Sequence, residues 1–275
     1  MAFSVNTNPG ALVALQTLNA TSAALNKTQS AINTGLKVAS AKDNAAVFAI
    51  AQNLRSDVAG LNSVKSSLDR AISTADVALA AGGAVSDLLI EMKEKAASAA
   101  DAGLDTASRT ALNDDFKQLR DQITTIVSNA SFNGINAVKN SGNNIVAILN
   151  DTAGSSLTIT AQDLSLTGAN VTLTPADVID TKTKAANVVT ALENSISNVN
   201  AALSKIGAGA KRLEMQKAFV TKLSDAIETG IGNLVDADLA KESAKLQSLQ
   251  VKQQLGLQAL SIANQAPGAV LGLFR

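Results

Sequence analysis

The chain lacks the side chains on which most enzyme sites depend. Its 275 residues include no cysteine and no histidine, which excludes thiolate and imidazole catalysis, disulfide bonds and the usual structural zinc sites. Tryptophan and tyrosine are also absent. Lys plus Arg equals Asp plus Glu at 23 each, and no cationic run with interleaved aromatic residues indicates a nucleic-acid surface. We therefore expect no cofactor, no metal, no catalytic site and no nucleic-acid partner.

Long apolar runs and helix breakers are equally scarce. No window approaches the roughly 18 uninterrupted apolar residues of a membrane span, so we expect no membrane insertion. The first residues, MAFSVNTNPG, have neither the basic region nor the apolar region of a cleavable secretory signal. Proline occurs only at positions 9, 175 and 267, which leaves long tracts where helices can continue.

Apolar residues at three- and four-residue spacing predict five long helices. Val47, Leu54, Leu61 and Leu68, for example, form an unbroken heptad series. The predicted helices cover residues 10–34, the stretch from the Ser40 capping box to 99, residues 107–129, some 50 residues from 181, and residues 238–264. Between 139 and 180 the residues are small, polar and β-branched, and 145–149 and 156–160 read as a β-hairpin. The expected fold is mainly α: a long antiparallel helical bundle or coiled coil with a small β-hairpin region and paired terminal helices.

One short segment, GLKVASAKDNAAVFAI at 35–50, separates two helices of different character. Gly35 can adopt the left-handed conformation that ends a helix, and Ser40 with Asp43 fits a capping box that starts the next one. The segment GIGNLVDAD at 230–238 reads as a similar break. The first predicted break lies where the sparsely charged N-terminal end meets the charged middle of the chain, and the second lies shortly before the sparsely charged stretch that begins at residue 246.

The two ends of the chain carry almost no charge. Residues 1–42 hold three lysines and no acid, and residues 246–275 hold only Lys252 and Arg275. All 23 carboxylates lie between 43 and 242. A weakly charged helix is normally buried, yet a single pair of helices cannot cover all its own faces. Other copies or another partner must supply the cover, unless both ends are disordered tails.

Two acid pairs and one glycine pair are the residues that could suggest a catalytic or phosphate-binding site. The acid pairs Asp114/Asp115 and Asp236/Asp238 are more typical of solvated charges or helix caps than of catalytic dyads. Gly207 and Gly209 lie in a helical stripe with no preceding strand, so close helix packing is favoured over a phosphate loop.

Several ordered motifs resemble those of the bacterial flagellins. TGLKVASAKDNAAVFAIAQNL at 34–54 resembles the flagellin segment that follows the first helix. FNG at 132–134 is similar to the turn after the third helix, and VDADLAKESAKLQ at 235–247 resembles the start of the last one. The ending ANQAPGAVLGLFR is close to the usual flagellin terminus. The resemblance covers about 1–138 and 185–275 and leaves the middle unmatched.

The resemblance implies three parts. Residues 1–42 and 236–275 would form a terminal coiled coil that lines the inner tube of a filament. Residues 43–138 and 181–235 would form a helical bundle in the outer tube, and 139–180 a small variable region. The spoke between the tubes would be the segment around Gly35, Ser40, Lys42, Asp43 and Asn44.

The function implied is a structural, non-enzymatic subunit that self-assembles into the extracellular flagellar filament used for swimming. The chain would leave the cell unfolded through a type III apparatus and copolymerise with itself and companion flagellins. It would also contact hook-associated junction and cap proteins and an export chaperone on its C-terminal helix. A hook–filament junction protein of the same two-armed family is the nearer alternative.

Residue roles follow from the resemblance and the spacing together. The predicted subunit interface comprises Leu15, Leu18, Leu25, Ile32, Leu36, Leu246, Leu249, Leu257 and Leu260, with Val270, Leu271, Leu273 and Phe274 as a terminal anchor. Some flagellins are O-glycosylated, and the hydroxyls available by composition are Thr152, Ser155, Ser156, Thr158, Thr167, Thr172 and Thr174.

Overall fold

The computed structural model describes residues 7–271, and describes side chains as far as residue 265. The chain divides into two compact units: unit 1 is Met1–Ser56 with Ala226–Arg275, and unit 2 is Asp57–Asp225. These boundaries fall inside helices. The functional division into 1–42 with 236–275, 43–138 with 181–235, and 139–180 stays a prediction.

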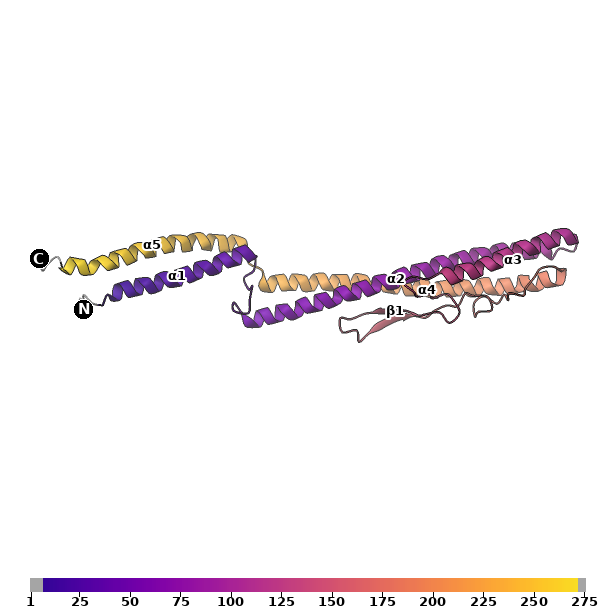
Figure 1. The fold of residues 1–275 in the computed structure, drawn as a ribbon, viewed down its shortest axis with the longest axis horizontal. Helices are drawn as coiled ribbons and strands as arrows, with labels where there is room; N and C mark the ends of the chain where they lie inside the picture. The colour runs from indigo at the N-terminus through magenta and orange to yellow at the C-terminus, as the bar shows by residue number, and fades with distance from the viewer. Residues whose placement is uncertain (1–6, 272–275) are drawn as a thin grey trace. The chain divides into compact units, whose positions relative to one another are not determined.

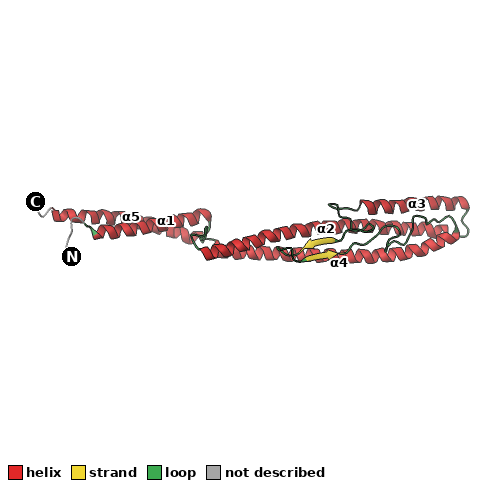
Figure 2. Ribbon diagram, turned by 60° about the horizontal axis from the view of Figure 1, so that its bottom comes forward, coloured by secondary structure: helices red, strands yellow, loops and turns green. Residues whose placement is uncertain are grey.

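Five helices and one two-stranded sheet make up the described chain (Figure 1). In chain order they are α1 (Pro9–Thr34), α2 (Ala45–Ala99), α3 (Thr106–Asn129), β1 (Ile145–Ile148), β2 (Ser156–Ile159), α4 (Lys182–Val235) and α5 (Leu239–Leu271). In Figure 2 most of the chain is drawn as red helix, and the two strands of the hairpin are the yellow elements. The predicted mainly helical fold with a β-hairpin is confirmed.

The helices begin at side chains that satisfy their first free N–H groups. Asn8 Oδ1 accepts a hydrogen bond from the Ala11 amide at 3.1 Å, ahead of a proline in the first turn of α1. Asp105 Oδ1 accepts from the Ser108 amide at 2.7 Å at the start of α3. That backbone hydrogen bond holds the pKa of Asp105 below its ordinary value. The N-terminal ends of these helices are therefore fixed by local sequence.

Glycines inside the long helices mark close approaches between elements. A Cβ at Gly82 of α2 would lie 2.5 Å from Leu203 Cδ2 of α4, so the residue that weakens the helix is the one that lets the two helices meet. A Cβ at Gly209 of α4 would lie 2.7 Å from Ile159 in β2. Gly209 therefore accommodates the hairpin, and no phosphate loop exists at this place.

The core of unit 2 is a bundle of α2, α3 and α4. Its fully buried large side chains include Leu68, Leu89, Met92, Phe116, Ile123, Leu192, Ile206 and Leu213. Ion pairs cross its surface from Lys93 to Glu193 at 2.9 Å and from Lys217 to Asp69 at 2.6 Å. Because higher numbers on α2 meet lower numbers on α4, the two helices are antiparallel.

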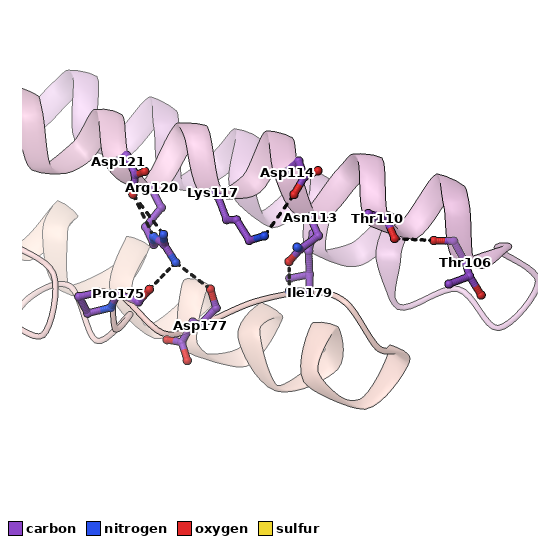
Figure 3. A network of polar contacts seen from close by, with 10 residues as sticks. All are labelled: Thr106, Thr110, Asn113, Asp114, Lys117, Arg120, Asp121, Pro175, Asp177 and Ile179. Atoms are coloured by element: carbon purple, nitrogen blue, oxygen red, sulfur yellow. Dashed lines mark hydrogen bonds and ion pairs between the residues drawn. The ribbon is translucent and has the colours of Figure 1, made fainter.

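A polar network fastens the segment before α4 to helix α3 (Figure 3). Asn113 Oδ1 accepts the Ile179 amide at 2.9 Å, where both residues are buried. Arg120 donates to the backbone carbonyls of Pro175 and Asp177, the latter at 3.2 Å. Buried backbone groups of a connecting segment need such partners, and here α3 supplies them.

The hairpin is antiparallel, with Ile145 opposite Ile159 and Ile148 opposite Ser156. Its Ile148 amide donates to Ser67 Oγ of α2 at 3.2 Å. Together with the Ile159 contact at Gly209, this bond seats the hairpin on both α2 and α4. A two-stranded sheet is marginal alone, so its support comes from the helices.

Helix α2 is long and apolar enough, by length and composition alone, to cross a membrane. A single such helix is weak evidence, because the core helix of a water-soluble protein has the same features. Part of its most apolar stretch is buried within the protein, and elsewhere along the helix as well as there α2 contributes core side chains such as Val64, Leu68 and Val85.

Candidate assembly interface

Helices α1 and α5 lie side by side and antiparallel in unit 1 (Figures 1 and 2). At one end, Asn8 Nδ2 donates to the Ala263 carbonyl at 2.6 Å. In the middle, a Cβ on Gly256 would lie 3.3 Å from Leu18 Cδ1. At the other end, Leu36 and Asp236 form an antiparallel β-bridge. The predicted pairing of the terminal helices is present.

Each helix presents a seam of residues that are less exposed than their neighbours and spaced by threes and fours, as in a coiled coil. On α1 the seam comprises Ala11, Ala14, Leu18, Thr21, Leu25, Thr28 and Ile32. On α5 it comprises Glu242, Leu246, Leu249, Gln253, Gly256, Leu260 and Ala263. Leu36 lies just beyond α1, half-buried beside its bridge to Asp236.

Two predicted members do not belong to this seam. Leu15 is 43% exposed and Leu257 is 55% exposed, so the expectation that they pack between α1 and α5 is corrected. The physical reason is that both helices are apolar on several faces, and spacing alone does not select the face that meets the partner helix. The larger prediction that these residues lie between subunits stays a prediction.

Sequence reasoning missed the small and polar members of the seam. Gly256 leaves room for Leu18, and a larger residue there would push α1 away. Thr28 is fully buried, and its Oγ1 has no hydrogen-bond partner in the described part of the chain. A search for three- and four-residue spacing that also counted alanine, glycine and threonine would have identified these seam residues.

Much of the apolar surface of this helix pair stays open to solvent. The large exposed side chains are Leu12, Val13 and Leu15 on α1, and Leu239, Val251, Leu255, Leu257 and Ile262 on α5. By helical periodicity Leu12 and the group Val251, Leu255 and Ile262 face away from the seam. Lys27 is the only charge on α1, and beyond Lys245 the described part of α5 carries only Lys252. An apolar surface of this extent with so little charge marks an interaction site.

The predicted spoke is an ordered connection in unit 1. Gly35 has φ of 72° and ends α1. The chain then forms backbone bonds with the end of α4, from the Lys37 amide to the Val235 carbonyl at 2.7 Å and from the Ala237 amide to the Gly35 carbonyl at 2.8 Å. Lys37 Nζ also donates to the Asn233 carbonyl at 2.9 Å. These bonds connect the segment that follows α1 to the segment between α4 and α5.

Helix α4 extends further into this connection than the sequence indicates. The predicted break began at residue 230, whereas α4 continues through Gly230 and Gly232 to Val235. A Cβ at Gly232 would lie 2.7 Å from Asp236 Oδ2. Gly232 therefore leaves room for the tight turn after the helix. Gly230 and Gly232 do not end α4, because tertiary packing overrides their low helix propensity.

Ser40 and Asp43 do not cap α2 as predicted: they close a turn ahead of the helix, which begins at Ala45 with Asn44 as its cap. Asp43 Oδ2 accepts from the Ser40 amide at 3.1 Å and from Ser40 Oγ at 3.0 Å. Asn44 Oδ1 accepts from the Val47 amide at 3.1 Å. The hydrogen bond from the Ser40 hydroxyl, followed by that from its amide, lowers the pKa of Asp43. Lys42 is exposed, and the side-chain bonds of this turn join only Ser40 and Asp43.

The turn closed by Ser40 and Asp43 gives a testable pH dependence. Because the folded pKa of Asp43 lies below the ordinary 3.8, the bonds of this turn stabilise the fold above the unfolded pKa, and that stability is lost as pH falls through the folded pKa. We expect Ser40→Ala to raise the Asp43 midpoint in a carboxyl NMR titration. Ser40→Thr keeps the hydroxyl donor and should leave the midpoint low. Equal midpoints in wild type and Ser40→Ala would contradict the assignment.

The remaining predicted residues fall in three places. The anchor residues Val270, Leu271, Leu273 and Phe274 lie outside the residues whose side chains are described. The hydroxyl residues Thr152, Ser155, Ser156, Thr158, Thr167 and Thr172 are exposed and Thr174 is half-buried. Thr172 Oγ1 donates to the Ala191 carbonyl at 3.2 Å, so among the exposed hydroxyls it is the least available for glycosylation.

The acid pairs have structural partners. Asp114 pairs with Lys117 and Asp115 with Lys95, both at 3.1 Å, and Asp238 Oδ1 accepts the Lys241 amide at 3.1 Å. The bond to Asp115 raises the pKa of Lys95. Within the described part of the chain, no group of three or more acidic residues is arranged to hold a metal ion.

Comparisons with known proteins agree with this architecture. The bacterial flagellin N-terminal helical region matches residues 5–143, and the bacterial flagellin C-terminal helical region matches residues 189–274. Flagellin FljN of Caulobacter vibrioides is 51% identical over 272 residues, covering 99% of this chain and 98% of the relative. Flagellin FljM of the same organism is 49% identical with the same coverage, and a Brucella melitensis flagellin is 34% identical over 99% of both chains.

Two solved structures share the fold. A Bacillus cereus flagellin has a TM-score of 0.50 at 24% identity, over 56% of this chain and 88% of its own. A putative hook-associated protein from Vibrio parahaemolyticus has a TM-score of 0.58 at 14% identity, over 70% and 100%. Since both are distant in sequence, they support the fold and do not favour the junction-protein alternative. The matched regions and the full-length relatives show that the chain belongs to the bacterial flagellin family and is a structural subunit of the flagellar filament.

Proposed function

We propose that the filament forms when copies of this chain cover one another's exposed apolar faces on the α1–α5 pair. The observation that carries the proposal is the set of exposed leucine, valine and isoleucine side chains on two helices with almost no charge. Burying apolar surface contributes about 25 cal/mol per Å², so repeated copies gain stability that one copy lacks. In this role Leu15 and Leu257 contact neighbouring subunits, and the Leu18, Leu25 and Leu249 side chains hold the pair together.

The three-part division follows from the same reasoning. The sparsely charged helix pair would form the inner tube, the charged bundle of 43–138 with 181–235 would form the outer tube, and 139–180 would face outward. The bonds of Lys37 and Ala237 within unit 1 support the proposal that the segment around Gly35 is an ordered spoke. The anchor at 270–274 would extend the apolar surface of α5.

Export and partners belong to this proposal too. Flagellins form an extracellular appendage, and we propose that this chain reaches it unfolded through a type III apparatus. An export chaperone would cover the apolar faces of α5 before assembly, because exposed surface of this kind associates prematurely. In the filament the chain would meet companion flagellins and, at the two ends, hook-associated junction and cap proteins. Glycosylation at exposed hydroxyls such as Thr158 is a further proposed modification.

Negative-stain electron microscopy tests the central claim. Full-length protein is concentrated in a kosmotropic salt, which strengthens apolar burial, beside a variant restricted to residues 43–245. We expect long uniform tubes from the full chain alone. Tubes from the 43–245 variant would show that α1 and most of α5 are dispensable, and monomers from both, where a related flagellin polymerises, would refute assembly through these helices.

A further inference from the structure

The two edges of the β1–β2 hairpin differ in how they are covered. At the β1 edge, the Ile148 amide points away from β2 and donates to Ser67 Oγ of α2 at 3.2 Å. At the β2 edge, a groove of about 520 Å³ lies between the strand and α4. It is lined on the strand side by Thr158, Thr160 and Gln162, and on the helix side by Lys205, Ala208 and Arg212. A helix side chain thus caps the β1 edge, whereas the β2 edge borders a groove.

The hydrogen-bond alternation of the hairpin identifies the backbone groups of β2 that face this groove. The Leu149 amide donates to the Ser155 carbonyl at 2.9 Å, so these two residues form a hydrogen-bonded pair. In an antiparallel ladder such pairs alternate with pairs whose backbone groups point outward. The N–H and C=O of Thr158 and the N–H of Thr160 therefore point away from β1, and within the described chain they have no hydrogen bond. An edge strand with free groups of this kind is a template for pairing with another strand.

The strand side of the groove is held in place by the rest of unit 2. The Gln162 amide donates to the Ala137 carbonyl at 2.8 Å, and Gln162 Nε2 donates to the Thr160 carbonyl at 3.1 Å. Gly209 lets β2 come close to α4, because a Cβ there would lie 2.7 Å from Ile159. The open edge is therefore fixed at the side of helix α4.

The helix side of the groove is positively charged. Lys205 and Arg212 are both exposed, and neither forms an ion pair in the described part of the chain. Seven residues apart, they lie on one face of α4 and about 10 Å from each other along its axis. Ala208 between them has a small side chain, and none of the described residues that line the groove is acidic. The groove therefore combines an open strand edge with two free cations.

We propose that this groove binds an extended acidic peptide segment of a partner protein, which adds to β2 as a third strand. The backbone of the peptide pairs with the outward groups of Thr158 and Thr160, as in strand addition to an open sheet edge. Alternate side chains of a strand point to the same face and lie about 7 Å apart. Two acidic residues separated by one other residue therefore bring their carboxylates within reach of the long Lys205 and Arg212 side chains. The ladder supplies affinity, and the charges select the partner.

Amide hydrogen exchange of the full-length protein, followed by NMR below its critical concentration for polymerisation, tests the strand addition. The probe is the capped peptide Val-Glu-Val-Glu-Val, in which β-branched residues favour a strand. At a peptide concentration ten times the Kd, only about one-tenth of the protein is unbound. We therefore expect the Thr158 and Thr160 amides to exchange about tenfold more slowly. Unchanged exchange of these two amides at that concentration would overturn the proposal.

Two altered peptides separate the contribution of charge from that of the backbone. Val-Lys-Val-Lys-Val reverses both charges, and Val-Glu-Pro-Glu-Val keeps both acids but lacks the central N–H that a strand ladder needs. We expect neither to slow the exchange of Thr158 or Thr160. Equal slowing by either peptide, or by inorganic phosphate alone, would show that the groove does not select an acidic strand.

A pair of charge-neutralising variants tests the helix side of the groove. Lys205→Gln with Arg212→Gln removes two surface ion pairs to the peptide, so we expect the Kd to rise roughly fivefold to tenfold. Lys211→Gln with Lys222→Gln changes the net charge equally at exposed positions of α4 outside the groove and should keep the wild-type Kd. A wild-type Kd in the first variant would refute the assignment. Every residue of the groove belongs to unit 2, so a failure here leaves assembly through α1 and α5 untouched.

Discussion

Leu25→Asp should abolish polymerisation while unit 2 stays folded. Leu25 is 8% exposed, at the centre of the seam between α1 and α5. A carboxylate there is buried opposite the leucines of α5 with no cation to pair with, since Lys27 is exposed on a different face. Large single-site effects of this origin reach about 4 kcal/mol. The helix pair would separate and the surface offered to other subunits would be lost.

The measurement has two parts. Sedimentation gives the critical concentration, which should rise by roughly a hundredfold or more, and thermal melting of unit 2 should be unchanged. Thr28→Val is the matched control, because Thr28 occupies the same seam and its hydroxyl has no partner in the described chain. This control should polymerise at least as well as wild type. Polymerisation of Leu25→Asp at the wild-type concentration would place the seam outside the assembly.

Leu257→Asp should also stop polymerisation, for a different reason. Leu257 is exposed on α5 beside the seam, so the substitution leaves the intramolecular contacts of Leu18, Leu25 and Leu249 intact. In the filament, however, the carboxylate would be buried against another subunit without a partner, at a cost of several kcal/mol. We expect a loss of polymer comparable to that of Leu25→Asp, with α1 and α5 still paired in the monomer.

Amide hydrogen exchange distinguishes the two variants. Protection of α1 should persist in Leu257→Asp and vanish in Leu25→Asp, because only the latter disrupts the seam. Val146→Asp, at an exposed hairpin position of unit 2, is the matched control for adding a surface carboxylate and should assemble normally. If Leu257→Asp forms filaments like the control, that side of α5 faces no neighbour and the proposed interface must be reassigned.

Most helix boundaries were predictable because the signals that set them are local, although the cap of α2 is Asn44 and not the predicted Ser40. Asn8, Asp105 and Asn44 cap their helices with side chains only three residues from the amides that they bind. The apolar spacing of α2 identified a helix through Gly82 and Gly83. The boundary at the end of α4 was misplaced, because the contacts that carry it on to Val235 involve Gly35, Lys37 and Val38, which are distant in sequence.

The sequence was enough to predict which segments form the candidate interface, and it was less informative about which of their side chains pack together. The shortage of charge on both terminal segments identified them as surfaces to be covered, since charge is counted without knowing any geometry. Which side chains meet within one chain was not available in the same way. Leu249 and Leu257 look equivalent in the sequence, yet Leu249 is buried and Leu257 is exposed. Only the antiparallel register between α1 and α5 separates them.

The sequence by itself determined that this protein is a set of long helices with two sparsely charged ends, because periodicity, capping and charge are properties of neighbouring residues. The tertiary structure alone decided which faces are already paired and which remain open. Gly256, Gly82 and Gly209 are helix-weakening residues in the sequence and points of close approach in the fold. Lys93, Lys95 and Lys217 are three charges among many in the sequence, and only the fold pairs them with Glu193, Asp115 and Asp69. Contacts between distant residues are set by packing, which no local pattern encodes.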